Sequence, residues 1–65
     1  MNKLVVTREN YRQEPTVYNI PIHSEKIAVL IEDGKLMVFK DEGELVIGFN
    51  YKEWDEYSIV KVYAD

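Results

Sequence analysis

The chain has 65 residues, no cysteine and a formal net charge of −4 at pH 7. This length holds one domain, so we expect a single domain over residues 1–65. Without cysteine the chain forms no disulfide and no thiolate metal site. The apolar run that begins at Leu4 is too short for a secretory signal, because the charged Arg8 ends it. No stretch approaches the roughly 20 apolar residues of a membrane helix. We therefore expect a cytoplasmic protein that does not contact membranes.

Two strands are expected in the first third of the chain. Residues 3–7 form a short apolar run, and residues 16–22 alternate between Tyr18, Ile20 and Ile22 on one side and more polar positions on the other. The polar segment between the two strands turns. Pro21 has no N–H for a sheet ladder, so the second strand is expected to lie at an edge or to be interrupted at Pro21.

The clearest local signal is a hairpin over residues 26–40. Asp33-Gly34 separates two apolar runs, and this dipeptide is preferred in two-residue type I′ turns because both positions take a positive φ. The turn fixes the register of the two strands. The expected pairs are Glu32–Lys35, Ile31–Leu36, Leu30–Met37, Val29–Val38 and Ala28–Phe39.

A second hairpin follows directly. Asp41-Glu42-Gly43 suits a three-residue loop that begins as a type I turn and ends with Gly43 in the left-handed region. Residues 26–49 are therefore predicted to form a three-stranded antiparallel meander. The expected pairs across the second hairpin are Lys40–Glu44, Phe39–Leu45, Met37–Ile47 and Leu36–Gly48.

The β pattern is interrupted at residues 50–56 and resumes at residues 57–63. Asn50 followed by Glu53 has the form of a helix-capping pair, and the segment is long enough only for a 3₁₀ turn. In the final strand Lys61 should reach water, so the opposite side should face the core. That side consists of Val60, Val62 and Ala64.

The chain is therefore predicted to be all-β: a small antiparallel sheet or barrel with a central three-stranded meander and a short 3₁₀ turn before the last strand. The order of meander, short turn and final strand resembles the second half of an SH3-like barrel. This resemblance concerns the fold alone, and no peptide-binding residue of that family is identified in the sequence.

Both faces of the meander are apolar by parity, because successive residues of a strand point to opposite sides. An antiparallel sheet that is solvated on one side should alternate apolar with polar residues, and this one does not. The rest of the chain offers cover for one face, so a second chain is expected to cover the other. The alternative is a monomer in which residues 16–22 and the loop of residues 51–57 cover both faces. The side proposed to face that second chain carries Leu30, Met37, Phe39, Leu45 and Ile47, together with Ala28 and Phe49.

No catalytic, cofactor-binding or metal-ligating residues are predicted. His23 and Ser24 are adjacent, and neighbours on an extended chain point in opposite directions, so they do not form a hydrolytic dyad. The acids of residues 41–44 lack calcium-loop spacing and fit a solvated hairpin tip. Glu32 and Asp33 also lie at a hairpin tip in solvent, so they are not predicted to act as a general acid–base pair. There is no glycine-rich phosphate loop.

Residues 51–57 contain three aromatic residues and three acids. Tyrosine and tryptophan are frequent in binding hot spots because they bury a large area and keep a polar group. The alternative is that the indole of Trp54 caps one end of the domain. The candidate partner-binding residues of this loop are Tyr51, Glu53, Trp54, Asp55, Glu56 and Tyr57.

The sequence favours a non-catalytic interaction or assembly protein that acts through the apolar face and the aromatic-acidic loop. Its partner would be a second copy, in a dimer or higher oligomer, or another protein of basic character. An alternative is an inhibitor, of the kind that phages encode, that uses acids of residues 41–56 to block a nucleic-acid-binding protein. The same acids disfavour direct binding to nucleic acid. A third interpretation, a small-ligand-binding or enzymatic domain, has no motif in its support.

Overall fold

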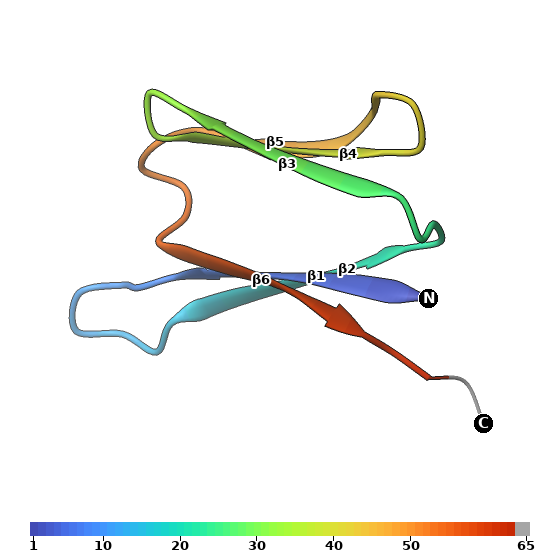
Figure 1. The fold of residues 1–65 in the computed structure, drawn as a ribbon. Helices are drawn as coiled ribbons and strands as arrows, with labels where there is room; N and C mark the ends of the chain where they lie inside the picture. Colours follow the sequence, from blue (N-terminus) through green and yellow to red (C-terminus); the bar gives the residue numbers. More distant parts are fainter. Residues whose placement is uncertain (64–65) are drawn as a thin grey trace.

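The computed structural model describes residues 1–63 and consists of strands, turns and loops, without a helix in that range (Figure 1). In the described part of the chain, six strands form two antiparallel three-stranded sheets, in the orders β2-β1-β6 and β3-β4-β5. The predicted all-β class is confirmed. Within residues 1–63, therefore, no helix has the length and apolar character needed to cross a membrane. The strands are β1 (Asn2–Arg8), β2 (Thr16–Ile22), β3 (Ile27–Glu32), β4 (Lys35–Lys40), β5 (Glu44–Phe49) and β6 (Glu56–Lys61).

In the first sheet, β1 lies between β2 and β6. Leu4 is paired with Ile20 on one side and with Ile59 on the other. Of the two alternatives predicted from Pro21, the structure has the first, because β2 is an edge strand and continues through Pro21 without interruption. This sheet joins the first and last strands of the domain.

The second sheet is the predicted meander, and its first hairpin has the predicted register. Glu32 pairs with Lys35 across the turn, and Asp33 and Gly34 have φ values of 51° and 76°, as a type I′ turn requires. In the second turn Gly43 has the expected positive φ of 103°, but Asp41 also has a positive φ of 54°, so the turn does not begin as type I.

The register predicted for β4 and β5 is correct at the turn and wrong beyond it. Phe39 pairs with Leu45 as expected, but Val38 pairs with Ile47, which leaves Val46 as an extra residue in β5. Such a bulge reverses the faces of all residues that follow it. The last two pairs are therefore Met37–Gly48 and Leu36–Phe49 instead of Met37–Ile47 and Leu36–Gly48.

The two sheets lie face to face as two layers, and no strand ladder joins one to the other among the described residues (Figure 1). The Cα extents of 36 × 32 × 11 Å match two sheets packed at about 10 Å. The side chains between them form the core, and the rings of Tyr18 from β2 and Phe49 from β5 are 5.6 Å apart. The buried apolar residues are Leu4, Val6, Ile22, Leu36, Val38 and Phe49.

The inner side of β6 differs from the prediction. Ile59 pairs with the buried Leu4 and so shares its inner face, whereas Val60 pairs with Lys3 and faces outward. Lys61 therefore lies on the inner side, at the end of the strand, where its ammonium is 3.6 Å from the carboxylate of Glu25. A lysine at a strand end reaches solvent along its flexible stem, so its charge did not decide which side is buried. Val62 is half-buried, and Ala64 lies outside the described residues.

The chain passes between the sheets twice, at residues 23–26 between β2 and β3 and at residues 50–55 between β5 and β6. These two connections lie at opposite ends of the structure (Figure 1). At one end the hydroxyl of Ser24 donates to the Asp41 carboxylate at 2.6 Å. At the other end the predicted short turn is a single hydrogen-bonded turn, in which the N–H of Glu53 donates to the carbonyl of Asn50 at 2.9 Å. The carboxylate of Glu53 in turn accepts the N–H of Asn50 at 3.1 Å, which is half of the predicted capping pair.

Candidate functional site

The side of the β3-β4-β5 sheet that points away from β1 is apolar and lies in solvent. We call it the outer apolar face. Leu30 and Leu45 are 46% and 57% exposed, although each pairs across the sheet with another large apolar residue. The face consists of Ala28, Leu30, Met37, Phe39 and Leu45, with Gly48 beside Met37 and the charged pair Glu32 and Lys35 at its end near the β3–β4 turn.

The alternation of β4 shows why the face exists. Leu36 and Val38 point inward and are fully buried, whereas Met37 and Phe39, which alternate with them, point outward and are only half-buried. A strand that is apolar at every position must present one row to each side. The first sheet covers one row and nothing in the described chain covers the other.

Four of the five residues proposed for an oligomer face lie on the outer apolar face, and Ile47 does not. The bulge at Val46 turns Ile47 inward, where it packs against the core. Phe49 is turned inward by the same bulge and is buried. The other four residues precede Val46 in the chain, so the bulge does not change the face on which they lie. They are Leu30, Met37, Phe39 and Leu45.

The outer face of the other sheet provides a comparison within the same molecule. Its central strand places Lys3, Val5 and Thr7 outward, and the opposing positions include Asn19 and Ser58. This mixture of polar and apolar side chains is typical of a sheet that faces water. The composition of the outer apolar face is therefore specific to one layer of the molecule.

The aromatic-acidic loop is held by its own contacts. The indole N–H of Trp54 donates to the carbonyl of Gly34 at 2.8 Å, and its ring meets that of Tyr57 edge-on at 6.1 Å. Asp55 accepts the N–H of Glu9 at 2.6 Å and donates its own N–H to the carbonyl of Thr7 at 2.8 Å. Trp54 also packs against the core, which agrees with the capping alternative.

The remaining residues of the loop are more open. Tyr51 is largely exposed, with the ammonium of Lys52 5.4 Å from its ring centre, and Glu56 is exposed at the start of β6. The acids of residues 41–56 do not form one surface. Those of residues 41–44 lie at the β4–β5 hairpin and those of residues 53–56 at the opposite end (Figure 1).

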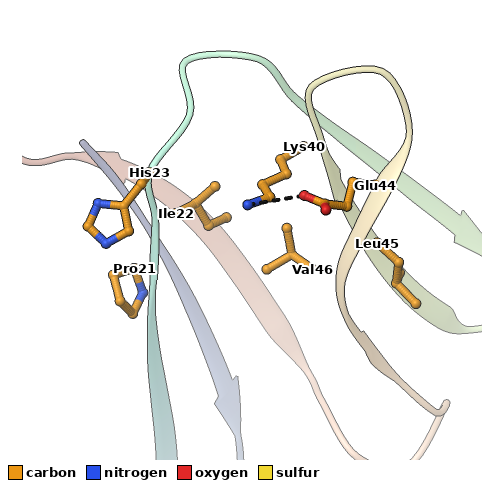
Figure 2. Close-up of a pocket in the computed structure, with 7 residues that line it drawn as sticks. All are labelled: Pro21, Ile22, His23, Lys40, Glu44, Leu45 and Val46. Atoms are coloured by element: carbon orange, nitrogen blue, oxygen red, sulfur yellow. Dashed lines mark ion pairs between the residues drawn. The ribbon is translucent and has the colours of Figure 1, made fainter.

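A shallow cleft of about 340 Å³ lies between the end of β2 and the β4–β5 hairpin (Figure 2). Ile22 and Val46 point into it, and Leu45 points away toward the outer side. The ammonium of Lys40 and the carboxylate of Glu44 are 3.1 Å apart, so each charge is already paired. The full lining is Pro21, Ile22, His23, Lys40, Glu44, Leu45 and Val46. Sequence reasoning did not bring these residues together, because the cleft depends on long-range packing of the two sheets.

Of the side chains considered for chemistry, those of Ser24, Asp41 and Glu44 are engaged in other contacts. The Ser24 hydroxyl donates to Asp41 and accepts the N–H of Lys26 at 3.1 Å, and neither contact involves His23. Asp41 and Glu44 thus have partners at the hairpin tip. Among residues 1–63 there is no group of three or more histidines and acids arranged to hold a metal ion.

Comparison of the chain with models of known protein families, with curated proteins and with solved structures finds no match.

Proposed function

We propose that this chain is a small non-catalytic protein that assembles with a protein partner through its outer apolar face. The observation that carries the proposal is the continuous apolar centre of that face, in which Leu30 and Leu45 are about half exposed. Contiguous apolar patches on soluble domains mark interaction sites, because their burial removes them from water at about 25 cal/mol per Å².

The neighbouring features support the same conclusion. The outer face of the first sheet mixes polar and apolar side chains, as a solvated surface does, so the two layers present different surfaces. The loop acids Glu53 and Asp55 are used in internal hydrogen bonds, and the acids at the two ends are separated. No specific observation therefore favours the acidic inhibitor over assembly through the apolar face.

A pair of matched substitutions tests the proposal. Leu45→Asp places a charge on the outer apolar face, and Val17→Asp places the same charge on the outer side of the other sheet. The two positions are both on edge strands and are 57% and 51% exposed. We expect Leu45→Asp to weaken assembly by at least about tenfold, since a charge in an apolar contact remains unpaired.

The measurement combines affinity capture from the native cell with the mass of the purified protein in sedimentation experiments. Wild type and Val17→Asp should recover the same partner, or the same assembly of copies, and Leu45→Asp should lose it. Equal recovery by Leu45→Asp, with the fold intact by circular dichroism, would contradict the proposal. A wild-type monomer that captures nothing would contradict it as well.

A further inference from the structure

The two sheets have four edge strands, and three of them carry features that oppose pairing with another chain. β2 contains Pro21, which lacks an N–H, and β5 contains the bulge at Val46. β6 carries Lys61 on its inner side, at the position opposite Asn2. Proline, bulges and inward-pointing charges are the usual means by which proteins protect sheet edges.

The fourth edge, β3, has none of these features. Residues 27–32 include no proline or glycine, and their pairing with β4 is regular throughout. The N–H of Asp41 donates to the carbonyl of Lys26 at 2.9 Å, so residues of this parity direct their main-chain groups toward β4. In an antiparallel ladder the alternate residues then direct theirs outward. Within residues 1–63, the main-chain donors and acceptors of Ile27, Val29 and Ile31 along this edge therefore have no partner.

The side of the sandwich formed by β3 and β6 leaves its inner residues more exposed than the side formed by β5 and β2. β5 lies over β2, where the ring of Phe49 meets that of Tyr18, and with β4 and β1 in the centre this leaves β3 over β6. On that side the inner residues are open to solvent: Ile31 is 48% exposed, and Ile59 and Tyr57 are also exposed. A chain placed beside β3 would cover apolar side chains as well as main-chain groups.

The residues of β3 are complementary to a second copy of β3 in antiparallel orientation. With Val29 opposite Val29, Ile27 lies opposite Ile31, and the outward-directed main-chain groups of both copies meet. In this register Lys26 lies opposite Glu32, so opposite charges pair at both ends of the joined strands. The registers shifted by two residues place Lys26 opposite Leu30 or Gly34 and lose this pairing.

We infer that two copies of this chain pair edge to edge through β3, with Val29 on the two-fold axis, to form one continuous six-stranded sheet. The joined edge holds about six main-chain hydrogen bonds, two for each pair of outward-directed residues. The outer apolar faces of the two copies become one surface, since Ala28 of each copy lies opposite Leu30 of the other. The inference concerns the edge of the sheet and does not depend on what the outer apolar face binds.

Charge reversal at the ends of β3 tests both the pairing and its register by sedimentation. Lys26→Glu alone and Glu32→Lys alone each place like charges opposite one another, and each should raise the dimer dissociation constant roughly tenfold. An equimolar mixture of the two variants should restore wild-type association, because each copy then supplies the charge that the other lacks. Lys52→Glu, which makes the same charge change in an exposed loop, is the matched control and should have no effect.

A change to one main-chain atom tests the hydrogen bonds directly. N-methylation of Val29 in a chemically synthesised chain removes an outward-directed donor while leaving the ladder with β4, so it should abolish the dimer and leave the strand content unchanged in circular dichroism.

A wild-type chain that stays monomeric at about 100 µM would overturn the inference. So would a dimer that Lys26→Glu, Glu32→Lys and N-methyl-Val29 leave unchanged. Loss of the dimer in Leu45→Asp alone would assign it to the outer apolar face, contradicting edge pairing while supporting the proposed function.

Discussion

The two faces of the β3-β4-β5 sheet are built from the same kinds of side chain and have opposite environments. Leu36 and Val38 are fully buried against the first sheet, whereas Leu30 and Leu45 on the other side are about half exposed. Hydrophobicity alone therefore does not assign a residue to the core of this molecule. The assignment depends on which face the β2-β1-β6 sheet covers, which is a long-range property of the fold.

The largest expected effect comes from shortening matched leucines on the two faces. Leu36→Ala should lower the free energy of unfolding by about 2–5 kcal/mol, because it leaves a cavity between the sheets. This is comparable to the whole stability of a domain of this size, about 3–5 kcal/mol. Leu45→Ala should change it by less than about 1 kcal/mol. Urea denaturation at low protein concentration measures both, and equal losses would remove the distinction between the faces.

The next effect concerns the turn that keeps the faces in place, since a slip of one residue would exchange them. A Cβ at Gly34 would lie 2.7 Å from the Cβ of Tyr51, in addition to the positive φ of 76°. Gly34→Ala should therefore destabilise the protein by about 1–3 kcal/mol. Gly43→Ala, where a Cβ would meet nothing within 4 Å, should cost only about 1 kcal/mol for its positive φ. Thermal denaturation that ranks the two variants in the reverse order would contradict the close approach at Gly34.

The smallest effect tests the orientation of β6. Ile59 lies on the inner face and Val60 on the outer face, although both are partly exposed. Ile59→Ala should cost about 1–2 kcal/mol and Val60→Ala about 0.5 kcal/mol. If chemical denaturation shows the greater loss for Val60→Ala, the inner side of this strand is the one predicted from the sequence.

The parts of the fold that could be predicted are those governed by a few neighbouring residues. Asp33-Gly34 specifies a two-residue turn and thereby the register of β3 and β4, and Pro21 limits β2 to an edge position or an interrupted strand. The bulge at Val46 could not be predicted, because both pairing patterns keep apolar residues on both faces. The position of β1 between β2 and β6 joins strands that are far apart in the sequence, and no local signal encodes it.

In the candidate site, too, the features set by neighbouring residues were predicted and those set by the bulge or by long-range packing were not. Leu30, Met37, Phe39 and Leu45 were predicted to share a face, since the turns on either side of β4 fix their parity. Ile47 was placed on that face wrongly, because it follows the bulge. The prediction for β6 rested on Lys61, and its position at the strand end allows an ion pair with Glu25 from the inner side. The open side at β3 could be recognised only once all four edges were known.

The contact between Trp54 and Gly34 has a practical consequence. Trp54 is the single tryptophan of the chain, and its hydrogen bond joins the β5–β6 connection to the β3–β4 turn. Its fluorescence emission should shift to longer wavelength when the sandwich opens and the indole enters water. The site is separate from the outer apolar face, so this optical signal should follow unfolding while sedimentation follows association. One untagged sample can therefore report the two processes independently.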